Sequence, residues 1–118
     1  MDSESKKSLD ITSIAFVTDA RLARVIKILD TAGECLNLKS DDDSQETYRF
    51  NTPSGAYVTA FWDLKPDIDE YETVVDVYEQ TDTGAAARLF EVVASSIEQR
   101  IVLFGPDSDE VVAESNVY

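Results

Sequence analysis

The sequence has little of the chemistry on which most active sites depend. Its 118 residues include no histidine and a single cysteine, Cys35. One chain therefore holds no Ser–His or Cys–His pair for nucleophilic catalysis, and no set of Cys and His ligands for a structural zinc ion. An internal disulfide is excluded as well, so we expect Cys35 to serve as a small buried hydrophobic residue. We predict no metal site and no cofactor.

Glycine and long apolar runs are scarce too. The four glycines form no Gly-rich loop of the kind that binds phosphate. No apolar stretch approaches the roughly 20 residues that cross a bilayer, and residues 1–10 lack the apolar core of a signal peptide. We therefore expect a cytoplasmic protein without membrane contact, whose polar segment 1–10 is disordered.

Basic residues are scarce as well. Ten Lys and Arg residues stand against 24 Asp and Glu residues, which gives a formal net charge of -14. A chain this acidic repels phosphate backbones, so we expect no direct binding to nucleic acid. Two explanations of the charge stay open: the partner is basic, or the protein is salt-adapted, since its composition resembles that of proteins from saline cells.

What the sequence does contain begins with residues 11–33. Residues 11–17 are rich in β-branched and aromatic side chains with bulk on both faces, which predicts an interior strand. A helix follows, with Thr18 or Asp19 expected as its N-cap and Gly33 expected to end it. Its buried stripe has helical spacing and consists of Leu22, Val25, Ile26 and Leu29.

The same helix carries a cluster of basic residues. Arg21, Arg24 and Lys27 lie on the side opposite the buried stripe, so three of the ten basic residues share one exposed face. This face is either a docking site for an anion or acidic partner, or a solvated surface that attracts the protein's own carboxylates.

The remaining pattern predicts a single α+β domain over residues 11–105. We expect a two-layer sandwich in which two helices pack on one face of a five- or six-stranded, mainly antiparallel sheet, in the order β-α-β-β-β-β-α-β. Residues 64–70 are expected to form a loop, and residues 106–118 an acidic segment or a short edge strand. The further strands are predicted at 34–39, 46–51, 56–63, 73–78 and 100–104, and the second helix at 83–98, capped by Asp82 or Thr83.

Two short stretches resemble known families. The strand, helix and strand of residues 11–39 resemble the start of a ligand-binding ACT domain, although Thr18-Asp19-Ala20-Arg21 stands where such domains commonly carry Pro-Gly. No binding residue is therefore carried over. A regulatory domain that senses a small molecule is our second hypothesis.

The second stretch is Asp82-Thr83-Gly84-Ala85, which resembles the Asp-Thr-Gly-Ala motif of retroviral-type aspartic proteases. In that family two chains each supply one carboxylate, and the pair shares a proton. The resemblance would make Asp82 the catalytic residue of a carboxylate-dependent enzyme. Helix capping is the competing interpretation, because residues 85–98 have helical periodicity.

The first hypothesis is a non-enzymatic acidic interaction or adaptor domain, of the inhibitor, immunity-protein or chaperone type, that docks a protein partner and can form a homodimer. Its acidic surface is expected to steer a basic partner. Large aromatic residues dominate interface energetics. The partner-binding candidates are therefore Tyr57, Phe61 and Trp62, together with Arg21, Arg24 and Lys27.

Overall fold

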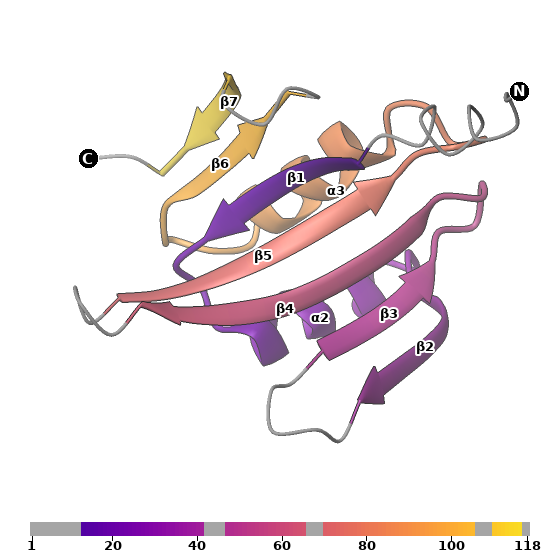
Figure 1. Cartoon of the computed structure of the whole chain (residues 1–118), viewed down its shortest axis with the longest axis horizontal. Coiled ribbons are helices and arrows are strands. Elements are labelled where there is room, and N and C mark those ends of the chain that lie inside the picture. Colours follow the sequence, from indigo (N-terminus) through magenta and orange to yellow (C-terminus); the bar gives the residue numbers. More distant parts are fainter. Residues whose placement is uncertain (1–12, 42–46, 66–69, 106–109, 117–118) are drawn as a thin grey trace, which may run out of the picture.

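The computed structural model describes residues 13–41, 47–65, 70–105 and 110–116. Within them the chain is an α+β fold with seven strands and two helices (Figure 1). In chain order these are β1 (Ser13–Thr18), α2 (Leu22–Thr31), β2 (Leu36–Asp41), β3 (Thr47–Asn51), β4 (Tyr57–Lys65), β5 (Glu70–Tyr78), α3 (Ala85–Ala94), β6 (Ile101–Phe104) and β7 (Val111–Ser115).

All strands join one antiparallel sheet in the order β2-β3-β4-β5-β1-β6-β7. The expected interior position of the first strand is confirmed, because β1 pairs with β5 on one side and β6 on the other. Although β2 follows α2 directly in the chain, it lies at the sheet edge, separated from β1 by three strands. The opening strand, helix and strand therefore do not form a unit of neighbouring strands.

Both helices pack on the same face of the sheet and lie behind it in Figure 1. The core fills the space between the two layers. Alternate residues of β1, β3, β4 and β5 point into it, and the stripe predicted for the first helix is buried as expected. The largest side chains with less than 2% exposure are Phe16, Phe50, Leu22, Leu29, Leu89 and Ile101.

The expected strand count of five or six was wrong. Residues 111–115 pair with β6 as an edge strand, so the element order gains a strand at its end. The loop expected at 64–70 is also shorter, because β4 continues to Lys65 and β5 begins at Glu70, and the two strands pair along nine residues each. Segment 1–10 lies outside the described residues.

The sequence predicted the C-terminal end of the first helix correctly but not the N-terminal ends of the two helices. Gly33 does end α2: its φ of 82° is left-handed, and the N–H groups of Gly33 and Glu34 donate to the carbonyls of Asp30 and Leu29, which is a Schellman motif. The N-caps expected from side chains were wrong, since Arg21 and Gly84 occupy these positions without a side-chain cap. The second helix is also shorter than residues 83–98 and spans Ala85–Ala94.

Candidate functional site

A groove runs between the two helices. Helices α2 and α3 are in contact and share the same face of the sheet. The groove between them has a volume of about 700 Å³. It is lined by Ala23, Arg24, Lys27, Ile28, Thr31 and Ala32 of α2 and the residue after it, and by Val92 and Ser96 from α3 and its C-terminal end.

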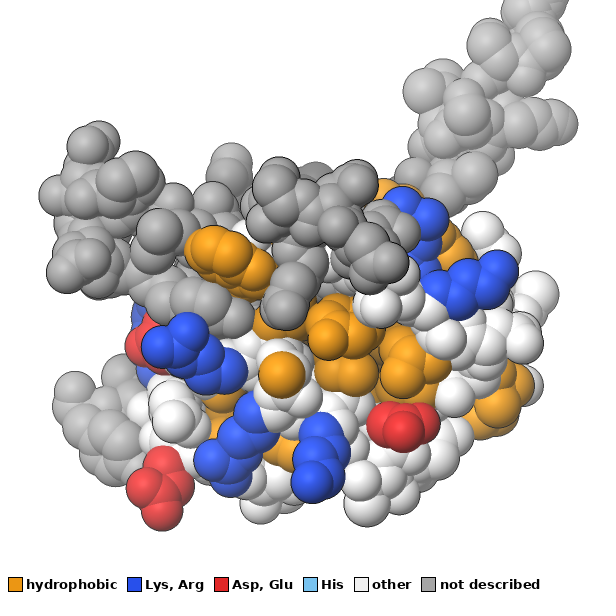
Figure 2. Space-filling view, turned by 90° about the horizontal axis from the view of Figure 1, so that it is seen from below, with side chains coloured by type: hydrophobic (Ala, Val, Ile, Leu, Met, Phe, Trp, Pro, Cys, Tyr) orange, Lys and Arg blue, Asp and Glu red, His pale blue; other side chains and the backbone are white. Residues whose placement is uncertain are grey.

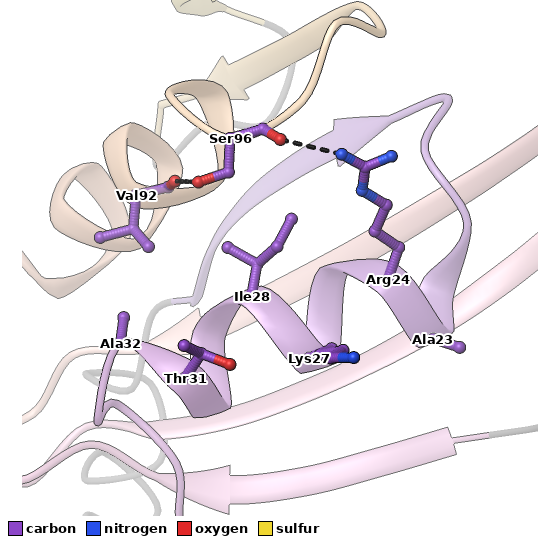
Figure 3. A pocket seen from close by; sticks show the side chains of 8 residues that line it. All are labelled: Ala23, Arg24, Lys27, Ile28, Thr31, Ala32, Val92 and Ser96. Atoms are coloured by element: carbon purple, nitrogen blue, oxygen red, sulfur yellow. Dashed lines mark hydrogen bonds between the residues drawn. The ribbon is translucent and has the colours of Figure 1, made fainter.

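The floor of this groove is apolar. Ile28 and Val92 are partly buried and pack against the core, and Figure 3 shows Ile28 pointing from α2 toward α3. Exposed Ala23 and Ala32 have side chains too small to fill the space above them. The sequence leaves the groove open because it places small residues on the side of α2 that faces solvent.

The rim of the groove is cationic. Arg24 reaches across the groove and donates a hydrogen bond from Nη2 to the carbonyl oxygen of Ser96, at 3.1 Å (Figure 3). Lys27 is exposed one turn further along α2. Among the described residues, neither cation has a carboxylate within the 4 Å of an ion pair. Within the described part of the chain, these two charges are therefore not neutralised by an ion pair.

The third predicted basic residue lies beside the groove. Arg21 is exposed at the start of α2 and does not line the hollow. Lys and Arg side chains gather beside exposed hydrophobic side chains in the face shown in Figure 2. The spacing of Arg21, Arg24 and Lys27 thus gives a basic surface along α2, two residues of which lie at the groove.

The three aromatic candidates do not form one surface. Tyr57 and Phe61 lie on the sheet face opposite the helices, where Tyr57 is 37% exposed. Trp62, their neighbour on β4, points to the helix side and packs partly buried against the core. Alternation along the strand predicts this split, so only Tyr57 and Phe61 remain as surface aromatic candidates.

Asp82 is held in an ion-pair cluster that sequence reasoning missed. Its two carboxylate oxygens accept hydrogen bonds from Nη1 and Nη2 of Arg88 at 3.0 and 2.8 Å, and Thr52 Oγ1 donates to it at 2.7 Å. Arg88 also donates to Glu34 from Nε and Nη2, at 3.0 and 3.1 Å. No local pattern reveals this cluster, because Glu34 and Thr52 come from parts of the chain far from Asp82 and Arg88.

The cluster fixes the charge of Asp82. The hydrogen bonds from Arg88 hold the pKa of Asp82 below its ordinary value, against the opposing effect of burial. In a proton-sharing pair, a second carboxylate raises one of the two pKa values, whereas the charged group beside Asp82 is the guanidinium of Arg88. The segment after Asp82 is helix α3, whereas the protease motif is followed by a strand. This geometry gives no support to an aspartic-protease site at Asp82.

Cys35 is partly buried and packs against the core. Burial, with nearby Asp30 and Glu34, raises the pKa of its thiol to about 12. Because the thiolate is the nucleophile, Cys35 is a poor nucleophile near neutral pH.

Metal-binding and membrane-spanning features are both missing from the described residues. No group of three or more His, Cys, Asp or Glu side chains in them is arranged to hold a metal ion. Neither of their two helices is long and apolar enough to span a membrane.

Comparison of the chain with protein-family models, with curated proteins and with solved structures found no match. Its own geometry is therefore the basis for assigning a function.

Proposed function

We propose that this protein is a non-enzymatic interaction domain, and that the groove between α2 and α3 docks an amphipathic helix of a protein partner with acidic side chains beside its apolar face. The observation that carries this proposal is the combination of an apolar floor with the cations Arg24 and Lys27, neither of which forms an ion pair with a carboxylate of the described residues.

The apolar part of the groove suits a helix. Amphipathic helices bind in hydrophobic grooves through side chains spaced at i, i+3, i+4 and i+7. Ile28 and Val92 offer the apolar contacts, and the small side chains of Ala23 and Ala32 leave room for the partner's side chains. The ten-residue helices α2 and α3 are each about 15 Å long, so about three turns of a partner helix cover the groove.

The charges set the orientation of the partner and its chemical class. Glu or Asp beside the partner's apolar stripe would reach Lys27 and the exposed side of Arg24, and such pairs give specificity more than affinity. The total charge of the chain predicts a basic partner, but the groove reverses this preference locally. We therefore expect the partner segment that enters the groove to be acidic.

The test uses a designed, fluorescein-labelled helical peptide of about four turns, with leucines at helical spacing and glutamates on both sides. Its counterpart carries lysines in place of the glutamates. We expect the Glu peptide to bind with a micromolar Kd in fluorescence anisotropy, and the Lys peptide at least about tenfold more weakly. The double variant Arg24→Glu/Lys27→Glu should no longer bind the Glu peptide with micromolar affinity, and it should bind the Lys peptide more tightly than the unsubstituted protein does.

Lys39→Glu/Arg49→Glu is the matched control, since it changes the charge equally on the opposite face of the sheet. It should leave the affinity for the Glu peptide within about twofold of the unsubstituted protein. Equal binding of both peptides, or equal loss of binding in the control, would contradict docking in the groove.

The second candidate is a regulatory domain that senses a small molecule. The groove volume of about 700 Å³ favours it, because ligand pockets commonly measure about 300–1,000 Å³. The matching ligand class is an apolar carboxylate, and dodecanoate is the probe. A dodecanoate-induced rise in melting temperature that is lost in Lys27→Glu, together with no binding of the Glu peptide, would favour this candidate over the first.

A further inference from the structure

The sheet face opposite the helices is uncovered by any helix of the described residues and faces the viewer in Figure 1. Its side chains form rows across the strands, because residues paired between neighbouring strands point to the same side. One row contains Asn51, Tyr57 and Tyr78, and another contains Thr47, Phe61 and Val74. The face therefore combines aromatic and aliphatic side chains with a few polar ones.

The row between these two is charged and symmetrically arranged. Thr59 on β4 pairs with Arg49 on β3 and with Asp76 on β5. The cation and the anion therefore lie one strand to either side of Thr59, at about the same distance from it, which is about 4.8 Å across the strands.

We propose that a second copy of this chain docks on this face, sheet against sheet, around a two-fold axis that runs along β4. Rotation about that axis exchanges the two sides of β4 and keeps the position along the strand. Asp76 of each copy then faces Arg49 of the other, so the contact is made twice, as a self-complementary interface requires.

The residues on the axis support this arrangement. Tyr57 and Phe61 lie on β4 in the rows before and after Thr59, so each meets its own counterpart across the interface. Paired aromatic rings stabilise interfaces beyond the area that they bury. The face thus places its two aromatic candidates where two-fold symmetry brings identical side chains together.

A hollow on this face lies where the second copy would insert. It has a volume of about 330 Å³ and is lined by Asn37, Lys39, Arg49, Phe50, Asn51 and Tyr57. It opens where β2 bulges next to β3, with Asn37 in a left-handed conformation at φ 57°. The proposed axis brings Asp76 and Tyr78 of the second copy over this basic, amide-lined hollow.

The carboxylate of Asp76 has no partner among the described residues. Its side chain makes no hydrogen bond or ion pair with any of them, and burial raises its pKa. A carboxylate that is partly desolvated without a partner is unfavourable. The guanidinium of a second copy would supply the missing charge.

The size of the face also suits a dimer. Five neighbouring strands, β2 to β1 in the sheet order, with about six residues each, give a flat footprint on the order of 500 Å². Each partner in a stable complex buries roughly 800 Å² of accessible surface. The footprint is of the same order, because protruding side chains make the accessible surface larger than its flat projection. The net charge of -14 per copy opposes association at low salt, so dimers are expected to need screening.

The test is a charge exchange followed by sedimentation in about 0.5 M KCl, where charge repulsion is screened. The unsubstituted protein should sediment as a dimer. Asp76→Arg and Arg49→Asp should each weaken dimerisation about 100-fold or more, because each sets like charges against each other twice. The double variant Asp76→Arg/Arg49→Asp should dimerise again.

Mixing the two single variants, Asp76→Arg and Arg49→Asp, gives the sharpest result. In a mixed pair, the arginine introduced in the first variant faces the aspartate introduced in the second. The native Arg49 of the first variant also faces the native Asp76 of the second, so both contacts are between opposite charges. The mixture should therefore form a heterodimer, although neither variant dimerises alone.

The controls are Glu91→Arg and Lys27→Asp, which make the same charge changes on exposed helix positions and should leave the dimer intact. Circular dichroism checks that each variant is folded, and the mixing experiment separates lost pairing from misfolding. A monomeric unsubstituted protein, dimeric single variants or a mixture that stays monomeric would each overturn the proposal.

Discussion

At the scale of single residues, Arg88 connects more of the molecule than any position singled out from the sequence. Its guanidinium binds Asp82 before α3 and Glu34 after α2, while Asp82 also accepts a hydrogen bond from Thr52 in the turn after β3. Arginine suits this position because its planar fork can donate to two carboxylates at once. The cluster ties both helices to one end of the sheet.

Replacing Arg88 is therefore expected to destabilise the fold. Arg88→Met leaves the carboxylate of Asp82, which is 5% exposed, without its charge partner. Breaking a fully buried pair costs about 3–5 kcal/mol. The side chain of Arg88 is 37% exposed, so water screens the pair, and we expect a loss of about 2 kcal/mol in urea unfolding at neutral pH. Lys27→Met, an exposed control, should change the unfolding free energy by less than about 0.5 kcal/mol.

The same experiment has a defined pH dependence. The pKa of Asp82 is lowered in the folded protein, so its contribution is fully present above the unfolded carboxyl pKa of about 3.9 and is lost as pH falls through the folded pKa. The difference between unsubstituted protein and Arg88→Met should stay constant from about pH 8 to about pH 5 and shrink below about pH 4. A difference that grows on acidification would contradict this assignment.

At the scale of elements, the two helices begin and end by different means. The C-terminal end of α2 depends on the left-handed Gly33, whereas α3 begins after another left-handed glycine, Gly84, with φ 87°. In the first turn of α3, the N–H of Ala86 donates to the carboxylate of Glu79 at 3.0 Å. A carboxylate before the helix thus provides the capping interaction that had been expected from Asp82 or Thr83.

Gly33→Ala tests the end of α2. Nothing lies within 4 Å of an added Cβ, so the cost comes from the backbone alone, and we expect a loss of about 1 kcal/mol in unfolding free energy. Gly33→Asn should cost less, because asparagine tolerates the left-handed conformation better. Equal effects of both substitutions in thermal denaturation would show that the backbone conformation is not the cause.

The sequence predicted correctly those features that depend on residues close together in the chain. Periodicity identified both helices, the interior position of β1 and the exposed basic face of Arg21, Arg24 and Lys27. It missed the length of the β4–β5 hairpin, because Pro66 and the acidic residues around it suggested a longer loop. It also missed the groove, whose two walls are α2 and the distant Val92 and Ser96, and the Arg88 cluster, because neither has a local pattern.

At the scale of the whole molecule, the charge of -14 should make stability depend on salt. Carboxylates repel one another in the compact state, and added ions screen this repulsion. We expect the melting temperature to rise by about 5 °C between about 0.05 and 1 M KCl. Replacing exposed Glu91, Glu98 and Glu114 by Gln should reduce this gain, whereas a salt-independent melting temperature would contradict charge repulsion as a limit on stability.

The central place of β1 has a consequence for how the chain reaches its native state. This strand is synthesised early, yet its two neighbours in the sheet are residues 73–78 and 101–103. Pairing over such long stretches of chain requires large loops to close first, which slows the search for the native arrangement. Refolding is therefore expected on the millisecond-to-second scale of sheet proteins. Until its final strands emerge, we expect the nascent polypeptide to expose apolar strands with unpaired edges, and such surfaces favour aggregation and recognition by chaperones.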